Sequence, residues 1–303
     1  MQFEVTILGS GAALPTSLRN PTSQYVECND RHILIDCGEG TQNQLRKYSI
    51  RVQKISHILI SHLHGDHYFG LVGLLSTMHL LGRDKGITVY GPEGLEQIIR
   101  LQLEIGGAKL DFALTFVTLT GKESRLIFED KLIEIHTFPL KHRIPANGFR
   151  INEKAKERPL DGEKFKRDGL SLTYIPRFKH GVNVPLEDGT TLYADDYTFP
   201  APAARSYAFC SDTIYQENIL PHISGVDLLY HEATFLDNMA DRAKVTFHST
   251  ASQAASIAKQ ANAKKLILGH LSARYMDGAA HLAEAKPIFD NVEVVEDGMV
   301  FTV

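Results

Sequence analysis

The 303-residue sequence has no tryptophan and only three cysteines. Cys28, Cys37 and Cys210 are too few for a disulfide framework and fit a protein of a reducing compartment. The net charge is only −4 at pH 7, so any contact with nucleic acid requires a local basic patch. Hydrophobic residues at 43% and charged residues at 22% exclude a disordered or collagen-like chain and indicate a soluble globular protein.

Long hydrophobic runs are also absent. The longest apolar stretch, Phe69–Leu81, is interrupted by Ser76, Thr77 and His79. It is shorter than the roughly 18 to 20 residues that span a bilayer, so it predicts a buried helix. No charged and apolar leader precedes the strand-like run Phe3–Leu8, which predicts no secretory signal. We therefore expect a cytoplasmic protein without membrane contact.

Short strand-like runs alternate with helical patterns along the chain. The strand-like runs are His32–Asp36, His57–Ser61, Ile87–Tyr90, Leu132–Phe138, Tyr207–Cys210, Leu228–Tyr230 and Leu266–Leu268. The helical patterns are Gly94–Glu104, Ser249–Gln260 and His281–Phe289. Strands mixed with helices in this way predict an α/β fold in which helices cover the sheets.

One segment, residues 148–181, differs in composition from the rest. It holds nine Lys and Arg against five Asp and Glu, and it has few apolar residues. We expect a protruding basic arm at about 148–181, inserted into a single domain that spans residues 1–303. The alternative is an ordinary charged surface insertion, because runs of charge usually form solvated faces.

The 14 histidines are densest in Ser61–His67, which reads Ser-His-Leu-His-Gly-Asp-His. In extended geometry His62 and His64 project to the same side, and Asp66 and His67 follow in the next element. Imidazole and carboxylate groups are typical zinc ligands. One ion cannot easily take all four from so short a loop, so the spacing indicates two adjacent metals. The alternative is a solvated histidine-rich turn.

Further ligands must come from distant segments, and His142, Asp212 and His270 are the candidates. Each follows a strand-like run, where α/β sheets gather their functional loops. Taken singly, each could be a capping aspartate or a buried core histidine. Taken together with the histidine-rich motif, they complete two coordination shells.

This motif resembles the signature of the metallo-β-lactamase superfamily. Five further motifs are similar to those of the ribonuclease Z family, the endonucleases that trim tRNA 3′ ends: Asp36–Thr41, Phe209–Thr213, His231–Thr234, His248–Thr250 and Gly269–Ser272. The resemblance covers nearly the whole chain in the right order, at the length of the short form. It implies the metallo-β-lactamase fold, a four-layer αββα sandwich with a protruding arm.

The resemblance also implies two zinc ions per subunit. One is held by His62, His64 and His142, the other by Asp66, His67 and His270, and Asp212 bridges them. Manganese and iron stay open, because histidine and aspartate accept several metals. Asp36 is expected to hydrogen-bond within the metal loop and so to orient its ligands.

Two adjacent metals would lower the pKa of a water, and the resulting hydroxide would attack phosphorus in line with the departing 3′ ribose oxygen. Asp66 is the candidate general base. His248 is the candidate proton donor, with Glu232 as the residue that orients it. The alternative for the His248 motif is that Ser249 and Thr250 only cap the following helix.

The resemblance implies precursor tRNA as substrate, held by the arm of one subunit of a homodimer for the partner's site. The candidate phosphate contacts of the arm are Lys164, Lys166, Arg167, Arg177 and Lys179. Arg19 and Asn20 belong to a loop that the family uses near the tRNA 3′ end, although Ser17 stands where the family has lysine.

Three functions compete. The first is a zinc-dependent endoribonuclease that removes the 3′ trailer from precursor tRNA. The second is a phosphodiesterase, lactone hydrolase or thioester hydrolase of small molecules, since fold and metals do not determine the substrate. The third is an inactive RNA-binding relative. The basic arm and the His248 motif favour RNA cleavage, and the presence of all seven candidate ligands disfavours an inactive relative.

Overall fold

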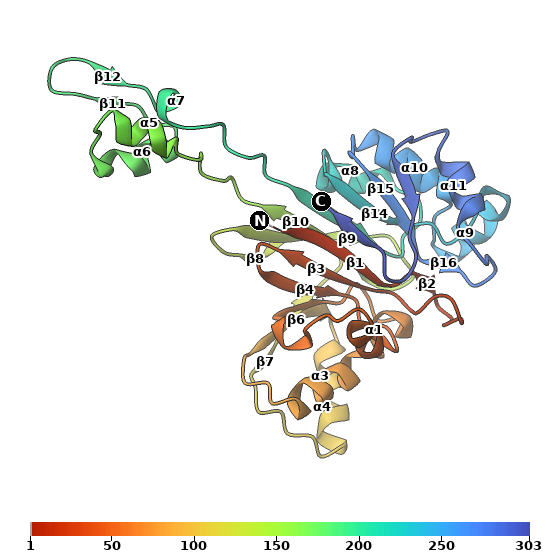
Figure 1. Ribbon diagram of the computed structural model, residues 1–303. Helices are drawn as coiled ribbons and strands as arrows, with labels where there is room; N and C mark the ends of the chain where they lie inside the picture. The colour runs from red at the N-terminus through yellow and green to blue at the C-terminus, as the bar shows by residue number, and fades with distance from the viewer. Residues whose placement is uncertain (1) are drawn as a thin grey trace.

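The computed structural model describes residues 2–303, and two seven-stranded sheets form its centre (Figure 1). The first sheet has the spatial order β18 (Val300–Thr302), β1 (Phe3–Gly9), β3 (Ser23–Cys28), β4 (Arg31–Ile35), β5 (His57–Leu59), β6 (Ile87–Pro92) and β7 (Leu114–Leu119). The second has the order β17 (Val292–Val294), β15 (Leu266–Gly269), β14 (Leu228–Glu232), β13 (Ser206–Cys210), β10 (Ala146–Glu153), β9 (Ile133–Leu140) and β8 (Arg125–Glu129). Two short pairs, β2 (Gly11–Ala12) with β16 (Leu271–Ser272) and β11 (Val184–Pro185) with β12 (Thr191–Leu192), lie outside them.

Helices cover the outer faces of both sheets. The α-helices are α1 (Thr41–Lys47), α2 (Gly65–Tyr68), α3 (Leu71–Leu80), α4 (Leu95–Ile105), α5 (Gly162–Arg167), α6 (Ile175–Lys179), α7 (Ala194–Tyr197), α8 (Leu220–Ile223), α9 (Ala240–Thr246), α10 (Ala251–Gln260) and α11 (Ala279–Ala285). Short 3₁₀ turns span Val52–Lys54, Leu172–Tyr174, Glu217–Ile219 and Asp237–Met239. Each predicted strand and helix overlaps an observed element, and the predicted buried helix within Phe69–Leu81 is α3.

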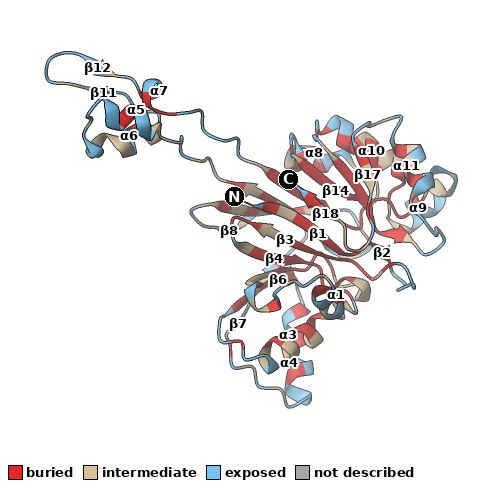
Figure 2. Ribbon diagram, viewed as in Figure 1, coloured by how far each residue is buried: buried red, intermediate tan, exposed pale blue. Residues whose placement is uncertain are grey.

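Three hydrophobic clusters separate four layers. One packs α1, α3 and α4 on the first sheet, one fills the space between the sheets, and one packs α8, α10 and α11 on the second sheet. The burial colours follow the same layers, with the sheets buried and the outer helix faces exposed (Figure 2). The predicted αββα order is therefore present. Among residues 2–303 no helix is both long and apolar enough to cross a bilayer.

The helices form where the sequence supplies an apolar stripe and a cap. Leu71, Leu74 and Leu75 are buried on one face of α3, at the spacing that places side chains on the same side of a helix. At the start of α10, the Thr250 side chain accepts a hydrogen bond from Gln253 N and the Gln253 side chain accepts one from Thr250 N. This capping box confirms that Thr250 caps the helix after His248.

The arm extends far from the sandwich (Figure 1), but its bounds differ from the predicted 148–181. Residues 148–153 belong to β10, which pairs with β9 and β13, and the chain returns to the body only at β13. The charge of the segment did not reveal where the arm begins, because the strand β10 before it also carries polar and charged residues on one face. The arm also has a small core of its own around Phe165, Phe178 and Tyr197, which the low apolar content did not suggest.

Candidate metal centre

The histidine-rich loop lies between β5 and α2, at the carboxyl end of a buried parallel strand. The buried carboxylate of Asp36 holds it in place. This carboxylate accepts hydrogen bonds from Ser61 N at 2.7 Å and Ser61 Oγ at 2.8 Å, and from His67 Nδ1 at 2.7 Å. His67 thus turns Nδ1 to Asp36 and Nε2 to the site. The predicted orienting role of Asp36 has the hydrogen bonds that it requires.

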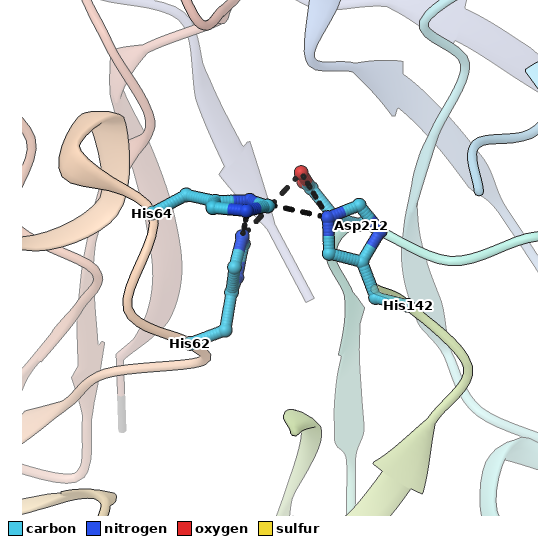
Figure 3. A group of neighbouring side chains, drawn as sticks. All are labelled: His62, His64, His142 and Asp212. Atoms are coloured by element: carbon cyan, nitrogen blue, oxygen red, sulfur yellow. Dashed lines mark hydrogen bonds and ion pairs between the residues drawn. The ribbon is translucent and has the colours of Figure 1, made fainter. Parts of the chain in front are cut away.

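Three imidazoles and one carboxylate converge in a first group (Figure 3). His64 Nδ1 lies 3.0 Å from His62 Nε2 and 3.2 Å from His142 Nε2. Asp212 Oδ2 lies 3.5 Å from His62 Nε2 and 3.7 Å from His142 Nε2. His142 is oriented by Phe247, whose carbonyl oxygen lies 2.9 Å from the other ring nitrogen. Four potential ligand atoms therefore face one point.

A second group lies on the other side of Asp212. His67 Nε2 is 3.4 Å from Asp66 Oδ2 and 3.4 Å from Asp212 Oδ1. His270 Nε2 is 3.5 Å from Asp66 Oδ2 and 3.2 Å from Asp212 Oδ1. The two oxygens of Asp212 are thus divided between the groups, which is the geometry of a carboxylate between two metal positions.

The donor set fits divalent cations. The Nε2 atoms of His67 and His270 are buried without a hydrogen-bond partner among residues 2–303, although buried polar atoms are normally paired. Burial lowers the pKa of His62 to about 3, so its lone pair is available at neutral pH. Burial would lower the pKa of His67 as well, but the carboxylates of Asp66, Asp212 and Asp36 outweigh burial and raise this pKa. Their carboxylates create the negative potential that attracts a cation.

Glu232 and Thr234 form a buried network behind the second group. Glu232 Oε1 lies 2.9 Å from His248 Nδ1, and Glu232 Oε2 accepts from the Thr234 hydroxyl at 2.7 Å. The same hydroxyl lies 2.9 Å from His270 Nδ1. Burial opposes protonation of His248, but Glu232 overrides it and raises the pKa of His248 to about 9. His248 is the proton donor candidate that the network positions.

A cavity of about 540 Å³ opens over both groups. Asp66, His64, His142, Asp212, His248 and His270 reach its wall. Its rim includes Arg143, Arg242 and Arg274, none of which the sequence analysis selected. Arg143 and Arg274 lie one and four positions after candidate ligands, and this proximity was the available signal. Arg242 belongs to α9 and had none. The cavity can therefore hold an anionic group directly above the metal positions.

Arg19 and Asn20, from the loop expected near the tRNA 3′ end, do not line this cavity. Arg19 is buried, and its Nη1 donates to Ser10 Oγ at 2.9 Å and to the carbonyl oxygen of Val295 at 2.8 Å. Asn20 donates from its amide nitrogens to Asp297 Oδ2. Both residues hold the loop before β3 against the C-terminal segment, because their donors satisfy buried acceptors there. The hydrogen bonds of Arg19 Nη1 and Asn20 Nδ2 that the structure shows are thus made within the protein.

The five candidate phosphate contacts of the arm lie on its helices α5 and α6. Lys166 and Arg177 are exposed. Lys179 pairs with Glu157 at 3.1 Å, and Lys164 Nζ donates to the carbonyl oxygen of Asp196 at 2.8 Å. Arg167 lies 3.3 Å from Asp168. The basic surface exists, but part of its charge is neutralised within the arm.

Known proteins are similar to this chain along its whole length. Ribonuclease Z from Cytophaga hutchinsonii is 48% identical to this chain, over 100% of it and 97% of its own length. The chain belongs to the ribonuclease Z family. The structure of the short form of human tRNase Z superposes with a TM-score of 0.73 at 30% identity and covers 98% of both chains.

Two other matches cover the fold. The metallo-β-lactamase fold protein YhfI from Bacillus subtilis superposes with a TM-score of 0.71 at 19% identity, over 100% of both chains. Residues 3–155 match the family model described as Anti-Pycsar protein Apyc1. The predicted metallo-β-lactamase fold is thus confirmed. As a member of the ribonuclease Z family, the protein is a hydrolytic endoribonuclease.

Proposed function

We propose that the protein removes the 3′ trailer from precursor tRNA, with two zinc ions per subunit. One observation carries the proposal: the two oxygens of Asp212 face separate groups of histidine nitrogens beneath an open cavity. The ribonuclease Z relatives support tRNA 3′ processing as the reaction. Nitrogen and carboxylate donors in sets of three or four support zinc as the metal.

The residues of the site divide the work. Two zinc ions at these positions would lower the pKa of a water and neutralise charge on the phosphate. Asp66 Oδ2 is held by Ala13 N at 2.8 Å and by the nearby rings of His67 and His270, and we assign the proton of the attacking water to its carboxylate. His248 is bound to Glu232 through Nδ1 and lines the cavity. It donates the proton to the departing 3′ oxygen.

The position of the arm supports a homodimer. The candidate ligand His142 lies just before the start of β10, whereas the arm begins after Glu153, at the other end of the same strand. Eight extended residues span about 25 Å, so the arm starts at the opposite end of the sheet from its own metal centre and extends away from it (Figure 1). An arm placed in this way serves a long substrate, bound in the partner's site, through contacts of Lys166 and Arg177.

We also place the protein in the cytoplasm, where precursor tRNA is processed. Cys28, Cys37 and Cys210 are all unpaired and buried, which supports a reducing compartment.

The test is cleavage of a 3′-extended precursor tRNA by the zinc-loaded protein, with the Asp66→Ala variant and bis-p-nitrophenyl phosphate alongside. We expect a product that ends at or next to the discriminator base, and a loss of about 10²- to 10⁴-fold in the variant. Hydrolysis of the small diester with intact precursor tRNA would retain the metal centre and overturn the substrate.

A further inference from the structure

A second cavity adjoins the metal cavity and shares a wall with it. It has a volume of about 470 Å³ and lies between the loop after β7, the loop between β9 and β10, and the segment after β13. His142 and Arg143 line both cavities. A strand bound over the metal positions therefore meets this neighbouring groove directly beyond a candidate ligand.

The groove carries unpaired positive charge. Lys122, Lys141 and Arg143 line it, and no Asp or Glu does. Within residues 2–303, none of the three forms an ion pair. The arm differs in this respect, because most of its basic residues have acidic partners: Lys154–Glu129, Lys156–Glu153, Arg158–Asp195, Arg167–Asp168 and Lys179–Glu157. Charge without an internal partner is available to an external anion.

The loop that carries Lys141 and Arg143 is anchored to the segments of the candidate metal centre. Lys141 N donates to Thr213 Oγ1 at 3.3 Å, and Ile214 N donates to the carbonyl oxygen of Lys141 at 3.0 Å. Arg143 Nη2 donates to the carbonyl oxygen of Val245 at 3.2 Å. This loop is thus held to the segments that present Asp212 and His248, so Lys141 and Arg143 start from a fixed backbone beside the metal positions.

The lining also indicates the kind of ligand. It contains no Phe, Tyr or Trp that could stack on a base, and its remaining side chains include Gln216, Asn218 and Pro145. Lys and Arg beside polar side chains suit backbone phosphates, which are recognised independently of sequence. We propose that this groove binds the backbone phosphates of the RNA strand next to the scissile bond. The assignment rests on the proposed function, since it takes the substrate to be RNA.

Binding, measured apart from cleavage, tests the groove. Fluorescence anisotropy of labelled precursor tRNA is recorded in the Asp66→Ala background, with and without the double substitution Lys122→Ala/Lys141→Ala. We expect the double substitution to weaken binding about tenfold at 0.1 M salt and to reduce the slope of log K against log salt by about 1.4, as for two lost phosphate contacts. Lys109→Ala, an exposed lysine after α4, is the control and should change neither quantity.

Each outcome decides one claim. Unchanged affinity and salt slope in the double variant, or an effect of equal size in Lys109→Ala, would overturn the groove as a phosphate site. Failure of the otherwise wild-type protein to cleave precursor tRNA would overturn the proposed function, while the binding comparison would still decide whether the groove contacts RNA.

Discussion

Glu153 and Arg205 form a two-fold ion pair that closes the base of the arm. Arg205 Nε donates to Glu153 Oε2 at 2.9 Å, and Arg205 Nη2 donates to Glu153 Oε1 at 2.8 Å. Glu153 is the last residue of β10, and Arg205 immediately precedes β13. The carboxylate also accepts from Lys156 Nζ at 2.7 Å and Asn29 Nδ2 at 3.0 Å. One buried side chain thus joins both ends of the arm to the sandwich.

We expect Glu153→Gln to lower the free energy of unfolding by about 2 kcal/mol at pH 7, because charge-assisted hydrogen bonds are lost. Burial alone would raise the pKa of Glu153, but Arg205 and Lys156 lower it to about 2 from 4.5. Because the pKa of Glu153 is lower in the folded than in the unfolded protein, the ionised carboxylate stabilises the folded state fully above pH 4.5. This stabilisation is lost as the pH falls towards 2. Thermal unfolding of both proteins from pH 7 to pH 3 should therefore show a shrinking difference.

Glu157→Gln is the matched control for this substitution. Glu157 pairs with Lys179 at 3.1 Å, but its side chain is 52% exposed, and exposed pairs contribute about 0–1 kcal/mol. Equal destabilisation by both variants, or a difference at pH 7 that persists unchanged to pH 3, would contradict the account of Glu153.

Loss of the proposed proton donor should depend on the leaving group. We expect His248→Ala to lower kcat on precursor tRNA by about 10²- to 10⁴-fold, because a ribose oxygen departs poorly without a proton. Bis-p-nitrophenyl phosphate releases a stable phenolate that needs no proton, so its turnover should fall much less. Steady-state kinetics on both substrates provide the comparison, with His79→Ala, a histidine of α3 outside the cavity, as control. An equal loss on both substrates would exclude proton donation by His248.

Thr234 should set the affinity of the second metal position. Its hydroxyl has one hydrogen, which it donates to Glu232, so it accepts from His270 Nδ1 and turns His270 Nε2 towards Asp212. We expect Thr234→Val to weaken zinc binding about 10- to 100-fold, measured by competition with a chromophoric chelator. Thr234→Ser keeps the hydroxyl and should restore the affinity. Equally weak binding by both variants would show that the methyl group, rather than the hydrogen bond, matters.

The sequence alone selected the residues that the structure brings together in the two groups, because their signal is local. His62 and His64 follow a buried strand at a spacing of two, and His142, Asp212 and His270 each follow another strand. Parallel strands bring their carboxyl ends to one edge of a sheet, so a pattern read along the chain predicts a cluster in space. The helix cap at Thr250 was equally readable, since a capping box spans four residues.

The tertiary structure alone decided what depends on contacts between distant segments. Arg19 has the charge expected of an RNA contact, yet it donates to Val295, 276 positions away in the sequence, and no local pattern reveals that partner. The ion pair of Glu153, at the end of β10, was hidden for the same reason, because the residues of the whole arm separate Glu153 from Arg205 in the sequence. The division of the Asp212 oxygens and the groove beside His142 likewise arise only when loops from both sheets meet. Composition and spacing determine which chemical groups are available, whereas burial and long-range hydrogen bonds determine which of them remain free to act.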